Sequence, residues 1–305
     1  MTLYSRSIDG ILPIDKPYGI TSMDVVRQIK KVSGQKKVGH AGTLDPIATG
    51  VIPICIGQAT RLTEFLIDST KEYRGVFELG VETDTYDSFG KTSAVKSTSG
   101  ITNKSINNIL VNFVGRVQQV PPIYSALKQK GRRLYELARM GEDVIVESRF
   151  VEVFDIVLES YNEPFITVFV KCGKGFYMRS LAHDIGQALG VGANMKDLRR
   201  LRTGPFLLKN CYSLDDATKM LMDGTYSKVM YAPDSILEHL KAIVMDDQTI
   251  QLLRNGQAVS LKAGLPSGID NELIKVYSSG GQFIALVKYK QSLKQWLPKK
   301  VFNLV

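Results

Sequence analysis

The chain has 305 residues, enough for one large domain and a small one or for two medium ones, and its 44% hydrophobic and 23% charged residues are typical of a globular protein. No apolar run approaches the ~18 residues that cross a bilayer, and the N-terminus lacks the basic-then-apolar layout of a signal peptide, so we expect a cytoplasmic protein without membrane contact. Thirty-nine Lys and Arg against 30 acids give a net charge of +9, which favours a phosphate-rich partner.

The first predicted elements in chain order are a short strand from residue 10, a turn over 16–19 and a helix. Thr21 and Asp24 have the spacing of a capping box, which predicts the start of this helix, and Gly34 can end it. A loop follows, then the short apolar run VIPICI, which is typical of a buried strand, and a helical stretch around TRLTEFLI.

The loop before VIPICI, GHAGTLDPIATG at 39–50, combines small residues with a single acid, Asp45. Its Gly and Pro residues predict a turn-rich loop whose backbone another molecule can approach closely. Pro46 biases Asp45 toward an extended backbone, which fixes the direction of the carboxylate. These residues alone favour an ordinary Asx turn over a functional site.

The next stretch alternates apolar and polar residues over 73–81, which predicts a half-buried strand. Tyr73 stands at its leading end, in the row that faces the interior. Residues 91–106 are rich in Ser, Thr, Lys and Asn, and we expect them to form a mobile connection to a helix over 106–115.

A basic stretch at 121–144 begins with a Pro pair and has no continuous apolar face, as expected of an exposed arm. A strand over 163–172 then turns through two glycines into a helix over 177–190. The apolar stripe of this helix leaves out Arg179, near the helix start. A second basic group, KDLRRLR at 196–202, fits either a solvated helix face or a contact to an anionic partner.

From about residue 236 the chain consists of short alternating runs separated by glycines, which predicts a small all-β domain. This segment holds nine Lys or Arg against five acids.

Five stretches together resemble the tRNA pseudouridine synthase B family, also called tRNA pseudouridine-55 synthase. They occur in the family's order and cover nearly the whole chain: LPIDKPYGITSMDVV, VGHAGTLDPIATGVIPICIGQATR, KEYRG with TDTYDSFG, PPIYSALKQKGRRLYELAR and GFYMRSLAHDIG. The resemblance implies an α+β pseudouridine synthase fold, with a central mixed, mainly antiparallel sheet flanked by helices. It implies a catalytic domain over 1–235 with a basic arm near 127–147, and a small β-rich, PUA-like RNA-binding domain over 236–305.

The activity implied by the resemblance is the conversion of a uridine to pseudouridine at position 55, in the T-arm loop of tRNA. The C1′–N1 bond breaks, the uracil turns in place, and C5 joins C1′. By the resemblance the essential aspartate is Asp45, the nucleophile, the tyrosine that stacks on the base is Tyr73, and the arginine of the site is Arg179. No metal or organic cofactor is implied.

Four more residues are candidates for substrate binding by the same resemblance. Tyr177 lies beside the arginine, Leu198 corresponds to an apolar or backbone contact to the base, and His40 corresponds to a contact to the RNA loop. Lys16 belongs to the first motif and either shapes the floor of the loop or touches substrate. The chain departs from its relatives at Phe176, where they usually have Thr, so the role of that hydroxyl is missing here.

The chemistry fits these residue types. Breaking a glycosidic bond builds positive charge on the sugar, which a carboxylate stabilises or attacks. Burial alone would raise the pKa of Asp45, and a neighbouring Arg179 would oppose that rise. Attack at C1′ and removal of a sugar proton to give a glycal both remain open. The uridine must be flipped out of its loop, and stacking on Tyr73 would offset part of that cost, while His40 could fill the vacated space.

Several alternatives follow from the same residues. A guide-RNA-directed pseudouridine synthase subunit shares the motifs, and a non-catalytic RNA-binding or RNA-folding module would share the fold. Glu82, Asp84 and Asp87 fail the calcium-loop pattern, and the few Cys and His have no metal-ligand spacing, so no metal site is predicted. Asp87 instead fits the turn before Gly90, with a supporting role. We expect the T-arm stem-loop of tRNA as partner and a monomer with no obligate protein partner.

Overall fold

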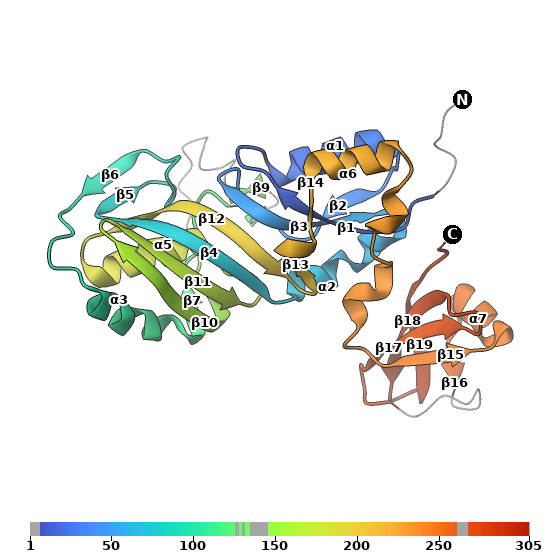
Figure 1. The fold of residues 1–305 in the computed structure, drawn as a ribbon. Helices are drawn as coiled ribbons and strands as arrows, with labels where there is room; N and C mark the ends of the chain where they lie inside the picture. Colours follow the sequence, from blue (N-terminus) through green and yellow to red (C-terminus); the bar gives the residue numbers. More distant parts are fainter. Residues whose placement is uncertain (1–6, 126–127, 130–131, 135–145, 261–267, 305) are drawn as a thin grey trace.

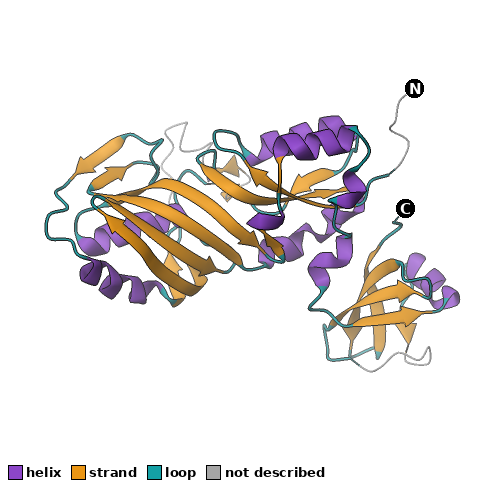
Figure 2. Ribbon diagram, in the orientation of Figure 1, coloured by secondary structure: helices purple, strands orange, loops and turns teal. Residues whose placement is uncertain are grey.

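The computed structural model describes residues 7–125, 128–129, 132–134, 146–260 and 268–304. A long ten-stranded sheet runs through the larger part of the molecule, and a five-stranded sheet forms a smaller unit at the C-terminal end (Figure 1). Helices pack against both sheets (Figure 2). No helix of the described ranges is long and apolar enough to cross a membrane.

The elements have the following bounds. From edge to edge, the main path of the long sheet is β14 (Tyr212–Ser213), β1 (Gly10–Lys16), β3 (Ala48–Ile56), β12 (Ala193–Thr203), β4 (Lys71–Leu79), β11 (Phe165–Cys172), β10 (Arg149–Asn162) and β7 (Gly115–Gln119). β2 (Val38–His40) pairs with β3, and β13 (Phe206–Leu207) pairs with β12. Two hairpins pair β5 (Val81–Thr83) with β6 (Thr92–Val95), and β8 (Lys128–Gln129) with β9 (Arg132–Arg133). The helices of this larger part are α1 (Ser22–Ser33), α2 (Thr63–Asp68), α3 (Asn103–Leu110), α5 (Met178–Leu189) and α6 (Leu214–Met222). The C-terminal sheet has the order β15 (Ala242–Met245), β17 (Leu273–Ser278), β18 (Phe283–Lys290), β19 (Gln295–Val301) and β16 (Val259–Ser260), beside α7 (Asp247–Arg254).

Strand directions settle the class of the large sheet. β1 pairs with β14, and β3 with β12, in parallel, while the other described pairs of this sheet are antiparallel. The sheet is therefore mixed and mainly antiparallel, with helices on its faces, and the expected α+β class is confirmed.

The start and the end of α1 are set by the capping residues that the sequence predicted. The Thr21 side chain accepts a hydrogen bond from the backbone N–H of Asp24, and the Asp24 carboxylate accepts one from the Thr21 backbone, which completes the predicted capping box. Gly34 ends the helix with a φ of 65°, a left-handed conformation that glycine adopts without strain.

The apolar side chains of β1 and β3 alternate between two cores. Leu12 and Ile52 face the main core, which α1, α3, α5 and α6 cover. Ile11, Val51 and Cys55 face the other way, into a second hydrophobic cluster. Because successive strand residues point to opposite faces, one short apolar run serves both cores.

The prediction of a mobile connection over 91–106 is wrong in two places. Residues 92–95 form β6, which pairs with β5, and α3 begins at Asn103 rather than at 106. The cause is a second capping box, in which the Thr102 side chain accepts from the Ser105 backbone and the Ser105 hydroxyl reaches back to Thr102. The polar composition of residues 91–106 led to the prediction of a loop where α3 begins.

The C-terminal domain is β-rich but not all-β, because it contains α7. Asp246 caps this helix by accepting from the Thr249 N–H at 2.7 Å, and Ile250 and Leu253 bury one face of it against the sheet. The predicted arm at 121–144 lies mostly outside the described residues. Its described part includes the β8–β9 pair and Leu134, which is buried.

The C-terminal domain shares a core with the rest of the chain. Phe283, Leu286 and Phe302 lie in the same cluster as Ile11 and Val51 of the large sheet. At the edge of this cluster the Arg61 guanidinium lies 4.9 Å from the centre of the Phe302 ring, and the Lys300 ammonium pairs with Glu64 at 3.1 Å. Removing residues 236–305 would uncover this apolar surface, so their role is better tested by surface substitutions.

Candidate active site

Asp45 lies in the loop between β2 and β3, and the backbone of this loop is held at several points. The Ser22 hydroxyl donates to the Leu44 carbonyl at 2.9 Å and accepts from the Leu44 N–H at 2.8 Å. Gly19 donates its N–H to the Pro46 carbonyl at 2.8 Å, which ties the 16–20 turn to the loop. The carboxylate is therefore presented from a fixed backbone.

Arg200 is the deepest of these supports. Its side chain is 1% exposed, and its guanidinium donates to the carbonyls of Val51 at 2.6 Å, Gly42 at 3.1 Å and Thr43 at 3.4 Å. Opposite it, Gly50 has a φ of 101°, and a Cβ there would lie 2.2 Å from the Arg200 carbonyl oxygen. The 196–202 segment is thus a strand, not a helix face, and this arginine stabilises the loop instead of meeting solvent.

We expect Arg200→Met to lower the free energy of unfolding by about 2–4 kcal/mol, because it leaves the buried Val51 carbonyl and the partly buried carbonyls of Gly42 and Thr43 without their charged donor. Conversion of uridine should also slow, since the loop that carries Asp45 loses its anchor. Chemical denaturation and a single-turnover assay measure both effects. Arg202→Met is the matched control, because Arg202 is 40% exposed and its ion pair with Glu72 is 3.5 Å long. Equal losses in the two variants would contradict this role.

Arg179, at the start of α5, joins Asp45 to a second carboxylate. Its Nε lies 3.0 Å from Asp45 Oδ2, and its Nη2 donates to Asp45 Oδ1 at 3.3 Å. Nε makes the ion pair by distance, but its N–H is not directed at a described acceptor. Nη1 lies 3.6 Å from Asp87 Oδ2, and further donation to the carbonyls of Thr85 and Tyr124 fixes the guanidinium. The side chain is only 6% exposed, so its charge acts in a poorly solvated position.

Asp87 is built into its turn rather than open to substrate. Its Oδ1 accepts from the Thr85 hydroxyl at 2.7 Å and from the Phe89 N–H at 3.0 Å, while its backbone carbonyl accepts from Gly90. The residue is 6% exposed. It therefore orients Arg179 and the turn, as its sequence position suggested.

The electrostatics of Asp45 combine opposing effects. Burial raises the pKa of its carboxyl above the usual 3.8, and the Asp87 charge adds to that rise. The Arg179 guanidinium opposes the rise, as does the Lys16 ammonium to a smaller extent. The burial of Asp45 thus raises its pKa, as expected from the sequence, and Arg179 offsets part of that rise.

A pH dependence follows from this balance. If the ionised carboxylate acts, the single-turnover rate should fall as the pH drops through the pKa of Asp45, with a midpoint above 3.8. Asp87→Asn removes a negative charge that raises this pKa, so the acid limb should move to lower pH. Rates measured from pH 4 to pH 8 test this. An acid limb that stayed in place or moved upward in the variant would assign it to another group.

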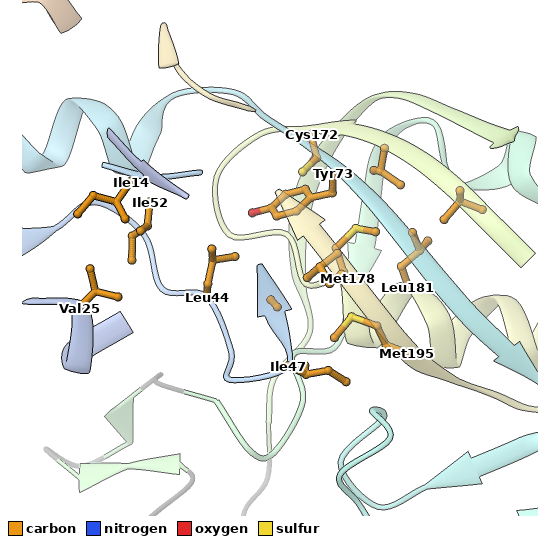
Figure 3. Packing of buried hydrophobic residues seen from close by; sticks show 14 of the residues in the cluster. Ile14, Val25, Leu44, Ile47, Ile52, Tyr73, Cys172, Met178, Leu181 and Met195 are labelled. Carbon is orange, nitrogen blue, oxygen red and sulfur yellow. The ribbon is translucent and has the colours of Figure 1, made fainter. Parts of the chain in front are cut away.

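Tyr73 and Leu198 lie on paired strands beside the loop. Tyr73, on β4, is 9% exposed, and Figure 3 shows its ring projecting toward the side where the loop residue Leu44 lies. Burial raises the pKa of its phenol, so the ring is neutral near pH 7. Leu198 stands on β12 opposite Gly75 of β4, and its carbonyl accepts from the Thr49 hydroxyl at 3.4 Å. Leu198 also pairs with Ala48, three residues after Asp45, and the Tyr73 phenol interacts electrostatically with the Asp45 carboxylate.

Tyr177 precedes α5 and is held by a side-chain amide. Its N–H donates to Gln119 Oε1 at 2.9 Å, and Gln119 Nε2 donates to the Tyr177 carbonyl at 3.0 Å. The Arg149 guanidinium lies 4.9 Å from the centre of the Tyr177 ring. Phe176 is partly buried against the main core, so the ring that replaces the usual Thr is used in packing.

His40 and Lys16 differ in their availability. His40 ends β2 half-buried, burial lowers its pKa, and its Nδ1 has no hydrogen-bond partner among the described residues. Lys16 is fully buried, and its ammonium donates to the carbonyls of Pro17 and Ile20 at 2.8 and 2.7 Å. Burial lowers the pKa of Lys16 to about 8. Its contacts match the shaping of the loop floor.

The described residues contain no group of three or more His, Cys, Asp or Glu side chains that could hold a metal. The geometry therefore places the Asp45 carboxylate beside the buried Arg179 guanidinium, which also faces Asp87, with the Tyr73 ring close enough for its phenol to interact with the Asp45 charge.

Comparison with known proteins places this arrangement in a family. Residues 30–178 match the TruB family pseudouridylate synthase N-terminal domain, and residues 179–245 match the tRNA pseudouridylate synthase B C-terminal domain. The tRNA pseudouridine synthase B of Geotalea uraniireducens is 40% identical, over 97% of this chain and 98% of that protein. That of Clostridium tetani is 41% identical, over 94% of this chain and 98% of that protein.

A solved structure shares the architecture. A chain in the crystal structure of a Cbf5-Nop10-Gar1 complex is 26% identical and superposes with a TM-score of 0.72, over 96% of this chain and 84% of that chain. The resemblance in five sequence motifs and the pseudouridine synthase fold are both confirmed. With two consecutive domain matches and relatives at about 40% identity over nearly their full lengths, the chain belongs to the TruB family of pseudouridylate synthases.

Proposed function

We propose that this protein is an isomerase that converts uridine to pseudouridine in the T-arm loop of tRNA, with Asp45 as the carboxylate that acts on the flipped-out nucleotide. The observation that carries the proposal is the contact between Asp45 and the buried Arg179 guanidinium. A carboxylate held ionised in a desolvated position can stabilise or attack the sugar carbon as the glycosidic bond breaks.

The number of free carboxylates favours isomerisation over hydrolysis. A glycoside hydrolase uses two carboxyl groups, one of which protonates the leaving group. Here the second carboxylate, Asp87, is buried and already accepts two hydrogen bonds. Uracil can leave as an anion, turn in place and rejoin C1′ through C5, after which C5 loses its proton and N1 takes one up. One carboxylate is sufficient for that sequence.

Substrate placement follows from the surrounding side chains. Tyr73 stacks on the extruded base, and Leu198 and Tyr177 border it. His40, whose pKa burial lowers, enters the RNA loop in place of the base. Lys16 shapes the floor of the loop through its hydrogen bonds to the carbonyls of Pro17 and Ile20. The protein acts in the cytoplasm as a monomer, without metal, organic cofactor or obligate protein partner.

Two other functions would use the same fold. A guide-RNA-directed subunit is one alternative, since it shares the sequence motifs and a chain solved in a complex with other proteins shares the fold. The relatives at about 40% identity, however, are named as tRNA pseudouridine synthases. A non-catalytic RNA-binding module would not need the Asp45–Arg179 contact.

The direct test incubates the pure protein with unmodified tRNA and maps pseudouridine by carbodiimide-blocked primer extension. A new stop in the T loop, without added guide RNA or protein, supports the proposal. A stop that appears only when a guide RNA is supplied would favour the guide-directed subunit. RNA binding without any stop would favour the non-catalytic module.

We also propose that residues 236–305 add affinity for RNA. Lys290 and Lys294 are exposed on this domain. Replacing both with Glu should weaken tRNA binding and flatten its salt dependence, because each lost phosphate contact removes about one unit of the log–log slope. The single-turnover rate at saturating RNA should hardly change. Unchanged binding at two salt concentrations would exclude these lysines from the interface.

A further inference from the structure

Two exposed aromatic rings meet beside the Asp45 loop. Tyr18 and Phe89 are 58% and 57% exposed, although burial of large aromatic side chains is strongly favoured. Their ring centroids are 6.2 Å apart at an interplanar angle of 78°, an edge-to-face contact. The two residues are 71 positions apart in sequence, so the fold brings them together rather than local chain geometry.

Both rings stand on turns that belong to the site. The Tyr18 turn is tied to the Asp45 loop through the hydrogen bond from Gly19 N–H to the Pro46 carbonyl. The Phe89 backbone N–H donates to Asp87, the same carboxylate that faces Arg179. The aromatic pair therefore has a fixed position relative to the carboxylate.

A hollow next to Tyr18 has a lining that suits a neutral ligand. This cavity of about 350 Å³ is lined by Asp15, Lys16, Pro17, Tyr18, Thr49, Arg199, Ser213, Leu214 and Asp215. Arg199 is paired with Asp15 at 2.8 Å, and the Lys16 ammonium is used by backbone carbonyls. The Ser213 hydroxyl donates to Asp216 at 2.6 Å and the Thr49 hydroxyl to the Leu198 carbonyl at 3.4 Å, so both are used within the protein. The Asp215 carboxylate has no ion-pair or hydrogen-bond partner among the described residues, which disfavours a phosphate there, whereas the exposed Tyr18 ring offers a nucleobase a surface for stacking.

We propose that Tyr18 and Phe89 form a stacking site for a second unpaired base of the RNA, a nucleotide that flanks the target uridine. This inference rests on the proposed function, because it assumes an RNA substrate at Asp45. A base that leaves its loop loses its own stacking, and an aromatic platform restores part of it. The site adds affinity and holds the strand in place, but takes no part in bond breaking.

The first test reports stacking directly. A T-arm stem-loop carries the fluorescent base 2-aminopurine on either the 5′ or the 3′ side of the target uridine, and is bound to the full-length protein with Asp45→Asn to prevent turnover. One of the two positions should lose fluorescence on binding, and Phe89→Ala or Tyr18→Ala should restore it. Tyr18→Phe keeps the ring and should keep the quenching. Quenching that survives both alanine substitutions would overturn the proposal.

The second test measures coupling between ring and base. Phe89→Ala should weaken binding of the intact stem-loop about tenfold, within the range expected for one stacked base. It should leave unchanged the binding of a stem-loop that is abasic at the flanking position. Phe154→Ala is the matched control, because Phe154 is 52% exposed on β10, and it should affect neither RNA. Equal weakening of both RNAs by Phe89→Ala would contradict a base contact.

Salt dependence separates this site from a phosphate contact. The slope of affinity against salt should be the same for Phe89→Ala and for the wild-type protein, since no phosphate contact is lost. A smaller slope in the variant would overturn the proposal. Failure of the proposed function is distinguishable: the wild-type protein would then form no pseudouridine. Failure of the stacking site alone would leave pseudouridine formation and RNA affinity equal in Phe89→Ala and wild type.

Discussion

Asp45→Asn should abolish pseudouridine formation and leave the affinity for tRNA within a few-fold of the wild-type value. The amide has nearly the shape of the carboxylate, but it can neither attack C1′ nor remove a sugar proton. We expect the single-turnover rate to fall by more than about a thousandfold, or about 4 kcal/mol of transition-state stabilisation. Product mapping and a binding titration on the same preparation measure the two quantities. Activity within tenfold of wild type would assign the catalytic carboxylate elsewhere.

The same variant has a second consequence, for stability. Burial raises the pKa of Asp45, so in the folded state the ionised carboxylate is disfavoured relative to the unfolded chain. The free energy of unfolding therefore decreases as the pH rises through the interval between 3.8 and the raised pKa. Above this interval Asp45→Asn, which carries no charge, should unfold at no lower denaturant concentration than wild type. A marked loss of stability at pH 7 would show that the charge supports the fold.

Arg179→Ala should reduce turnover at least a hundredfold, because it removes the cation that faces two carboxylates. The loss of one partner from a buried ion pair costs about 3–5 kcal/mol of stability, so folding is checked by thermal unfolding. Arg179→Lys should recover stability better than activity, since an ammonium cannot contact Asp45 and Asp87 through separate nitrogens of a planar group. Arg74→Ala serves as control, because Arg74 is 50% exposed and pairs with Glu159 on the sheet surface. Wild-type turnover in Arg179→Lys would rule out a need for the guanidinium geometry.

Local signals in the sequence were sufficient for much of the fold. The capping box at Thr21 and the glycine at 34 defined α1, and the alternation from Tyr73 onward defined β4 and its inward row. These features depend on neighbours within a few positions, so the interactions that determine them can be identified from the sequence alone. The positions of Asp45 and Arg179 were expected on family resemblance, and the structure brings them into contact.

Other features depend on partners far away in sequence. In the sequence, Arg200 is one more charged residue in a basic run. In the structure its guanidinium donates hydrogen bonds to carbonyls about 150 positions earlier in the chain. One indication of this buried role is that Gly50 lies opposite Arg200. The sequence alone does not show this, because it depends on the pairing of β3 with β12. The aromatic pair of Tyr18 and Phe89 is invisible for the same reason. The capping residue Asp246 was a local signal for the start of α7. The surrounding strand-like runs nevertheless led to the prediction of an all-β domain.

The shared cluster at the back of the large sheet has a consequence for how the chain folds as it is made. Ile11 leaves the ribosome about 290 residues before Phe302, yet the two lie in one hydrophobic cluster. The part of the outer face of β1 and β3 that packs against Phe283, Leu286 and Phe302 therefore stays exposed to water until these residues have been made. Nascent chains stalled before residue 283 should bind chaperones that recognise such surface, and chains released whole should not.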